Sequence, residues 1–308
     1  MDAKAVSRAR AEVSARGLAL LRLPNVDAEA LEKLAEDLHE PESGQRLRRK
    51  GNAAKTTPAR VGPRREGAVK GHARVRRLGN VPGALFCRTG AEWHADGLGR
   101  WTALACIKAP SNGGGDTLFA WSHEMLERLR PETRAIADDL VCRFGDRFVS
   151  GSTSTSAEDA RHGFRMNALG TRILRNAETR SSPRDPTRGF SIPLVRNEGT
   201  SLTVDMRHFE HFEGMDVNES RDLLEAILLE GLGVSAPPDP LQGLDPVSLF
   251  ARGDHAIFDD RCVYRHRWQP GDVLVWDNDV ILHSPTATAP YEGFPGSREM
   301  LQIIFRAP

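Results

Sequence analysis

The sequence has no long hydrophobic run and little that suggests a disulfide framework. No apolar stretch approaches the roughly 20 residues that a membrane-spanning helix requires. The basic N-terminal stretch is not followed by an apolar segment with a small-residue cleavage site. The 4 cysteines are scattered and form no C-x-x-C pair, which is typical of buried thiols in a reducing compartment. These absences predict a cytoplasmic protein with no membrane segment.

The formal net charge of the chain is zero, and aromatic residues are few. The 42 basic and 42 acidic side chains of the 308 residues cancel, which argues against a nucleic-acid partner. Aromatic residues make up only 6% of the chain, but 39% of it is hydrophobic, which is enough for a sizeable core. Length alone allows one large domain or two small ones, and we expect a single domain over residues 1–308. The oligomeric state stays open.

The apolar pattern predicts strands in the core and helices at its periphery. Apolar or alternating segments predict strands at 17–23, 101–109, 201–206, 255–268, 272–278 and 300–305. Helical periodicity predicts helices at 28–40, 123–139 (interrupted at Pro131) and 218–233. Strands dominate the last third, and no glycine-rich phosphate-binding motif is present. The expected fold class is α+β or mainly β, with a β-barrel or jelly-roll core.

Two polar segments interrupt this pattern. Residues 46–77 hold twelve Lys or Arg against one acid, Glu66, and residues 150–190 are rich in Ser, Thr, Arg and Gly. A run of one charge is usually a solvated loop. The alternative is a lid that attracts an anionic substrate, since a cleft of one sign concentrates the opposite charge. We expect both segments to be inserts or lids on the core.

A short motif, Trp93-His94-Ala95-Asp96, carries two candidate metal ligands. Residues two apart on a strand project from the same face, so His94 and Asp96 can reach one metal ion. The pattern alone is weak, because H-x-E also occurs at His208 and at His211. The alternative is that His94 and Asp96 make an ordinary contact at the surface or in the core.

A third candidate ligand, His283, lies far downstream, after Trp-Asp-Asn at 276–278. Two histidines and one carboxylate on one face are the ligand set of non-haem Fe(II), which leaves coordination positions open. A structural zinc site is disfavoured because no cysteine accompanies the three residues. The alternative for His283 is a hydrogen-bonded core histidine near a strand end.

Arg298 enters an otherwise apolar strand near the C-terminal end. An unpaired guanidinium is costly to bury, and a bidentate carboxylate partner offsets that cost. A strand-edge arginine in water is the alternative.

Five segments, spread over most of the chain, match a known family in the family's order. They are GLALLRLPNVDAEALEKLAEDL, EWHADG, GGGDTLFAWSHEMLERLRPETRAIADDL, EGMDVNESRDLLEAILLEGL and VYRHRWQPGDVLVWDNDVILHS. The last keeps the spacing R-W-x-P-G-D-x-x-x-W-D-N-x-x-x-x-H. In these segments the chain resembles the TauD/TfdA (taurine dioxygenase-like) family of Fe(II)/2-oxoglutarate-dependent dioxygenases.

The resemblance implies a double-stranded β-helix (jelly-roll, cupin-like) core with peripheral helices. It implies that His94, Asp96 and His283 bind Fe(II), and that Thr117 and Arg298 bind 2-oxoglutarate, with O2 as the second cosubstrate. The implied reaction oxidises an unactivated C–H bond of a small molecule by hydroxylation, desaturation or ring formation, and releases succinate and CO2. Related halogenases leave the carboxylate position vacant for chloride, so Asp96 points away from halogenation.

The chain departs from the family pattern at several positions. Many members carry a second arginine four residues after the first, where this chain has Gln302. Either fewer charges hold 2-oxoglutarate, or Arg306 takes part. Ser191 stands where the family has a histidine.

The arginine-rich lid segments favour an anionic or amino-acid-like substrate. Two alternative functions use the same barrel. One is a non-catalytic small-molecule-binding or sensor protein, and the other is a cupin-type metal hydrolase or isomerase.

Overall fold

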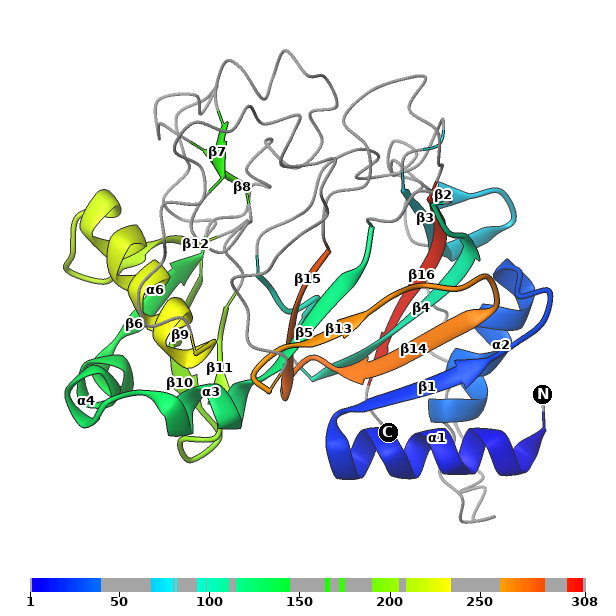
Figure 1. Cartoon of the computed structure of the whole chain (residues 1–308), viewed down its shortest axis with the longest axis horizontal. Helices are drawn as coiled ribbons and strands as arrows, with labels where there is room; N and C mark the ends of the chain where they lie inside the picture. The colour runs from blue at the N-terminus through cyan, green and yellow to red at the C-terminus, as the bar shows by residue number, and fades with distance from the viewer. Residues whose placement is uncertain are drawn as a thin grey trace, which may run out of the picture.

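In the residues that it describes, the computed structural model of the chain has five helices and several antiparallel sheets (Figure 1). It describes residues 2–39, 68–79, 81, 93–97, 99–110, 115–144, 164–166, 172–174, 190–204, 209–233, 261–285 and 298–306. The helices of this part are α1 (Ala3–Arg16), α2 (Ala28–His39), α3 (Ser122–Arg128), α4 (Pro131–Asp139) and α6 (Val217–Gly231). None of the described helices has the length and apolar character needed to cross a membrane.

The main sheet has six strands in the order β1-β14-β4-β16-β3-β2. Its strands are β1 (Leu18–Arg22), β2 (Ala68–Val69), β3 (His72–Gly79), β4 (Arg100–Lys108), β14 (Asp272–Asp277) and β16 (Glu299–Arg306). A second sheet has the order β13-β5-β15. Its strands are β5 (Thr117–Trp121), β13 (Tyr264–His266) and β15 (Ile281–Pro285).

Shorter strands form three smaller sheets. One has the order β12-β6-β9, and the others are the pairs β10-β11 and β7-β8. Their strands are β6 (Val141–Phe144), β7 (Phe164–Met166), β8 (Arg172–Leu174), β9 (Phe190–Pro193), β10 (Val195–Arg196), β11 (Ser201–Leu202) and β12 (Phe209–Phe212).

The main sheet and the β13-β5-β15 sheet share one apolar core. Leu104 of β4 and Trp276 of β14 lie in the same buried cluster as Phe119 of β5 and Ile281 of β15. Because successive side chains of a strand point to opposite faces, Thr102 and Gln302 belong to this inner face as well. Polar side chains on this face are therefore brought toward the space between the two sheets.

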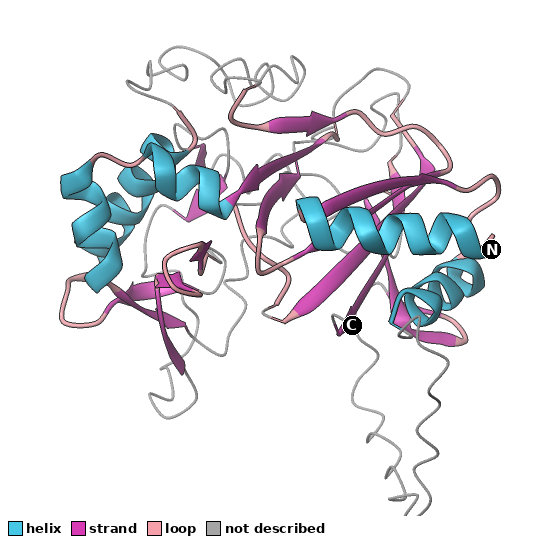
Figure 2. Cartoon of the chain, turned by 90° about the horizontal axis from the view of Figure 1, so that it is seen from below, coloured by secondary structure: helices cyan, strands magenta, loops and turns pink. Residues whose placement is uncertain are grey.

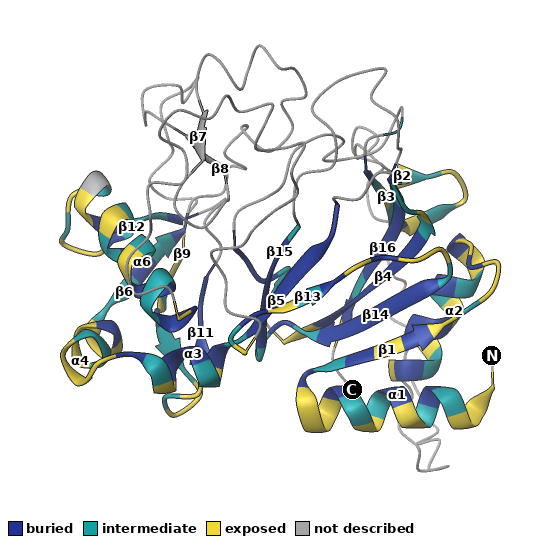
Figure 3. Ribbon diagram, viewed as in Figure 1, coloured by how far each residue is buried: buried dark blue, intermediate teal, exposed yellow. Residues whose placement is uncertain are grey.

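The outer face of the main sheet is covered by α1 and α2 (Figure 2). Leucines of α2 and small apolar residues of α1 pack in one cluster with the outward residues of the central strands. These outward residues are Ala103, Ala105, Val273, Val275, Leu301 and Ile303. Both faces of β4 and β14 are therefore buried (Figure 3), which explains why these strands are continuous apolar runs in the sequence.

The remaining helices, α3, α4 and α6, lie on the other side of the molecule beside the β12-β6-β9 sheet (Figure 1). Their cluster includes Phe144, Phe212 and Leu228. A hydrogen bond from the Ala95 backbone N–H to the Val204 carbonyl, 2.9 Å long, links this part to the H-x-D motif.

The structure confirms the expected strand-rich core, the three predicted helices and the helix break at Pro131. Helix α1 is an addition that the sequence pattern did not predict. Asp2 caps its N-terminus by accepting the Lys4 N–H, and Gly17 ends it in the left-handed conformation at φ 77°. Its apolar stripe is only Val6, Ala9 and Val13, which is a weak periodic signal.

The loop interpretation of residues 46–77 is wrong at its C-terminal end. Residues 68–69 and 72–77 belong to β2 and β3, at the edge of the main sheet. Two of the basic residues there face acids, since Arg77 lies 3.0 Å from Glu299 and Arg74 lies 3.8 Å from Glu36. Residues 46–67 lie outside the described residues, as does most of 150–190 apart from β7, β8 and the first residue of β9.

Gly79, at the end of β3, is expected to be intolerant of any side chain. Its φ is 132°, and a Cβ there would lie 2.0 Å from the Arg298 backbone oxygen. Gly79→Ala is expected to lower the free energy of unfolding by about 2–3 kcal/mol, from backbone strain and displacement of β16. Denaturant unfolding measures this loss.

Gly71 provides the matched control for this prediction. It has a comparable φ of 85°, but a Cβ there meets nothing within 4 Å. Gly71→Ala is expected to cost only about 1 kcal/mol, from backbone strain alone. Equal losses in the two variants would contradict the close approach of β16 at Gly79.

Candidate metal centre

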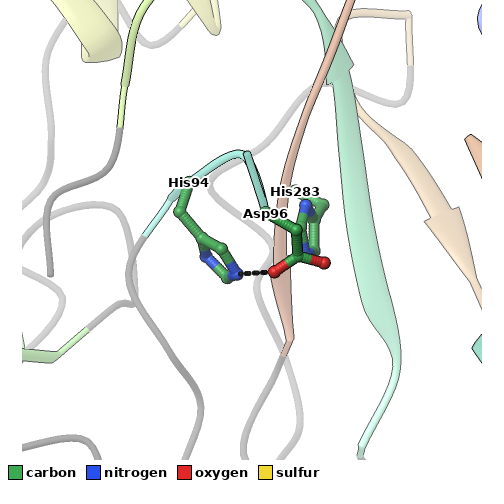
Figure 4. Close-up of side chains that lie close together, drawn as sticks. All are labelled: His94, Asp96 and His283. Atoms are coloured by element: carbon green, nitrogen blue, oxygen red, sulfur yellow. Dashed lines mark ion pairs between the residues drawn. The ribbon is translucent and has the colours of Figure 1, made fainter. Parts of the chain in front are cut away.

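His94, Asp96 and His283 meet where the segment before β4 runs beside β15 (Figure 4). His94 and His283 form an antiparallel bridge, with N–H···O distances of 3.0 and 2.9 Å in the two directions. The bridge sets their rings 4.1 Å apart. One ligand atom from each of the three residues lies within 4.8 Å of the others. Residues almost two hundred positions apart therefore share one small site.

The three side chains are well shielded from water, with exposed fractions between 4% and 6%. Trp276 packs its edge against the His283 ring at 4.8 Å, and Phe119 stacks on it at 6.2 Å. These rings restrict the orientation of the imidazole, because the space around it is filled.

The chemistry of the donor set fits Fe(II). Two imidazoles and a carboxylate, with no thiolate, match the ligands of non-haem iron sites that keep open coordination positions. Among the described residues, no other group of three or more His, Cys, Asp or Glu is placed to hold a metal ion.

The rival H-x-E pairs lie elsewhere. His208 is outside the described residues, and His211 is on β12, where it is paired in register with Arg143 of β6. Residues 209–212 form β12, and helix α6 follows at Val217. Their strand belongs to a small sheet separate from the two core sheets.

Arg298 and Thr117 form a second, adjacent site. Arg298 is buried, and its Nη2 lies 3.4 Å from Thr117 Oγ1. Burial lowers the pKa of Arg298 to about 10, and the nearby Cys106 and Asp116 oppose that shift only in part. An anion bound beside the guanidinium would restore the interactions that its charge loses on leaving water.

Thr117 is poised to donate a hydrogen bond. Its oxygen accepts from Trp268 Nε1 at 3.0 Å and from Arg298 Nη2. A hydroxyl has two lone pairs and one proton, so with both lone pairs occupied the proton is directed to an acceptor. Arg298 and Thr117 thus offer donors in the same place, which is the chemistry that a carboxylate needs.

Trp268 is in turn held by His266. The two rings meet edge to face at 4.5 Å, and His266 Nε2 lies 3.1 Å from Asp272 Oδ2. Burial lowers the pKa of His266, although Asp272 acts in the opposite direction. This arrangement positions the indole N–H on Thr117.

The alternative arginine is far from this site. Arg306 is exposed at the opposite end of β16, where it is paired with Arg100. Gln302 does not extend the Arg298 site either, since its Nε2 donates to Asp96 Oδ2 at 2.9 Å. Ser191, on β9, donates a hydrogen bond to Glu213, and both residues are exposed, away from the Arg298 site.

Sequence reasoning missed the polar side chains that surround Asp96. These are Thr102, Asn278 and Gln302. Thr102 and Gln302 were visible as polar residues in otherwise apolar strands, and Asn278 as the last residue of Trp-Asp-Asn. Only the strand pairing shows that Thr102 and Gln302 meet at the Asp96 carboxylate, while Asn278 accepts the Asp96 backbone N–H.

Comparison with known proteins finds two curated relatives of the chain. The chain is similar to pentalenolactone F synthase of Streptomyces arenae, with 24% identity over 220 residues, 69% of this chain and 60% of that protein. It is also similar to the alpha-ketoglutarate-dependent 2,4-dichlorophenoxyacetate dioxygenase of Burkholderia sp. (strain RASC). There the identity is 27% over 199 residues, 62% of this chain and 51% of the relative. The matches therefore span between half and three fifths of the curated relatives.

The fold is shared with solved structures. A taurine dioxygenase from Burkholderia xenovorans superposes with a TM-score of 0.55 at 16% identity, over 100% of this chain and 82% of the other. This likeness confirms the expected double-stranded β-helix core. The sequence model of the taurine catabolism dioxygenase TauD, TfdA family matches residues 2–228 and 246–304, which include the H-x-D motif, the distal histidine and Arg298. By that match, the chain belongs to the TauD/TfdA dioxygenase family.

Proposed function

We propose that the chain is an Fe(II)- and 2-oxoglutarate-dependent dioxygenase that oxidises an unactivated C–H bond of a small molecule. The observation that carries the proposal is the meeting of His94, Asp96 and His283 within 4.8 Å on the inner side of the barrel. Membership of the family and the dioxygenase names of several relatives support it.

The protein's own residues would hold the metal and orient 2-oxoglutarate. His94, Asp96 and His283 would hold iron on one face and leave the opposite face open. Iron with 2-oxoglutarate supplies the oxidising chemistry, in which O2 is consumed and succinate and CO2 are released. Arg298 and Thr117 would orient 2-oxoglutarate through its distal carboxylate.

The register of β5 and β15 supports this arrangement. His283 is paired with Phe119, and Pro285 with Thr117. Two residues along a strand span about 6.7 Å, which a five-carbon dicarboxylate can bridge. The buried rings of Phe119 and Trp276 beside His283 help to keep water from the metal.

For the substrate, we propose a small anionic or amino-acid-like molecule. The support is the excess of basic residues in 46–67 and 150–190. A panel of acidic, neutral and cationic metabolites, screened for stimulated succinate release, tests the proposal. Stimulation by neutral or cationic compounds alone would contradict it.

The reaction class is tested by measuring succinate from 2-oxoglutarate under air, with and without added Fe(II). Iron-dependent succinate release that is absent in Asp96→Ala is the expected result. A non-catalytic binding protein on this barrel would release none, and a cupin-type hydrolase or isomerase would act on its substrate without consuming 2-oxoglutarate.

Thr117→Val is expected to weaken 2-oxoglutarate binding moderately. The substitution keeps the shape of the side chain and removes a neutral hydroxyl donor, which contributes about 1 kcal/mol, or about fivefold in Kd. Equilibrium binding of 2-oxoglutarate to the metal-loaded protein measures the change. An unchanged Kd would remove Thr117 from the site.

A further inference from the structure

The carboxylate of Asp96 is held by two neutral donors from the main sheet. Thr102 Oγ1 lies 3.1 Å and Gln302 Nε2 lies 2.9 Å from the same oxygen, Oδ2. Thr102 on β4 and Gln302 on β16 are 0% and 7% exposed, so neither bond competes with bulk water.

The direction of the Thr102 bond follows from Asn278. Asn278 Oδ1 accepts the Asp96 backbone N–H at 2.9 Å and Trp276 Nε1 at 3.0 Å, which identifies the oxygen of the amide. Its Nδ2 therefore donates to Thr102 Oγ1 at 2.9 Å and to the Arg100 carbonyl. Since the Thr102 oxygen accepts that proton, its own proton is directed to Asp96.

Distance alone does not show which oxygen of Asp96 would bind a metal. Oδ1 lies 3.6 Å from His94 Nε2, and Oδ2 lies 3.6 Å from His283 Nε2. The hydrogen bonds distinguish them. A carboxylate oxygen has two lone-pair positions, and at Oδ2 both are engaged by Thr102 and Gln302.

We propose that Thr102 and Gln302 are positioning residues that hold Oδ2 of Asp96, so that the carboxylate binds the metal through Oδ1. The inference rests on the metal centre proposed above. Asn278 supports this arrangement, because it accepts the Asp96 backbone N–H and directs the Thr102 proton to Asp96.

The neutrality of Gln302 matters for the metal. An amide fixes the carboxylate without a charge, whereas a cation in contact with Asp96 would compete with the metal ion for the same negative charge. Gln302 therefore orients the Asp96 carboxylate, and the negative charge of Asp96 stays available to the metal ion.

The test uses Co(II) as the probe, added to the metal-free full-length protein and followed by its visible absorption. The variants are Thr102→Val, which removes the hydroxyl but keeps the shape, Thr102→Ser, which keeps the hydroxyl, and Gln302→Met. Thr133→Val is the matched control, because it removes a comparable bond of 2.9 Å to Glu230 on α6, remote from the metal centre. Asp96→Ala tests the ligand itself.

We expect Thr102→Val and Gln302→Met each to raise the Co(II) Kd about tenfold and to change the Co(II) absorption spectrum. Thr102→Ser should restore both, and Thr133→Val should match the wild type. Melting of the metal-free proteins should differ little, which separates positioning from a loss of fold. If Thr102→Val does not fold, the Co(II) Kd and absorption spectrum of Gln302→Met test the positioning role.

Two results would overturn the inference, and they differ in meaning. Unchanged Kd and spectrum in Thr102→Val and Gln302→Met, with binding lost in Asp96→Ala, would refute the positioning role alone. Unchanged binding in Asp96→Ala would refute the metal centre and the inference together.

Discussion

Replacing His94, Asp96 or His283 with alanine is expected to abolish iron retention and turnover while the fold survives. Each change removes one of only three protein ligands, so the remaining two cannot hold Fe(II) against dilution. The fold should survive because none of the three side chains belongs to the apolar clusters of the core. Iron content after desalting, succinate release and thermal melting measure the three outcomes.

His211→Ala provides the matched control for the triad variants. His211 is also a histidine in an H-x-E pair, but it lies on β12 in the small sheet. This variant, and His208→Ala, should retain iron and activity. Full activity in His94→Ala or His283→Ala would contradict the assignment of the ligands.

Arg298→Ala is expected to raise the Kd for 2-oxoglutarate by roughly two to four orders of magnitude. Removing one partner of a buried ion pair typically costs about 3–5 kcal/mol, because the other charge is left without a counter-charge. Arg298 is buried beside Thr117, and Thr117→Val should have a much smaller effect. Titration of the metal-loaded protein with 2-oxoglutarate measures both.

Arg306→Ala is the control for the choice of arginine. Arg306 lies on the same strand but is exposed at its other end. Its loss should leave the Kd for 2-oxoglutarate unchanged. A larger effect from Arg306→Ala than from Arg298→Ala would show that the wrong arginine has been placed in the site.

The sequence predicted the candidate site better than it predicted its surroundings. His94 and Asp96 were identifiable from their spacing of two residues, and His283 from its place after Trp-Asp-Asn at 276–278. Their convergence depends on the bridge between His94 and His283, which joins residues far apart in the chain. No local pattern encodes such a pairing.

The supporting residues are harder to find for the same reason. Thr102 and Gln302 reach Asp96 only because β4 and β16 are neighbours, with Thr102 opposite Ile304 and Gln302 opposite Leu104. Register between strands is set by packing over the whole sheet, so a single sequence shows a polar residue there but not its partner.

For the charged stretch before Gly79, the sequence led to a wrong prediction of secondary structure. Its basic residues suggested a loop, yet Val75 is fully buried in β3 while Arg74 and Arg77 face acids of α2 and β16. Strand β3 lies next to the short edge strand β2, where outward charges are tolerated and help to protect the edge from pairing with other chains. Composition alone therefore misjudged a strand as a loop.

Labelling with heavy-isotope O2 measures most directly whether iron, 2-oxoglutarate and O2 react together at this site. The Fe(II)-loaded protein is given 2-oxoglutarate and a stimulating substrate under labelled O2, and the succinate is analysed by mass spectrometry. One labelled oxygen atom in each succinate, with no labelled succinate formed by Asp96→Ala, is the predicted result. Unlabelled succinate from the wild type, or equal labelling in Asp96→Ala, would contradict a 2-oxoglutarate-dependent oxygenase built on His94, Asp96 and His283.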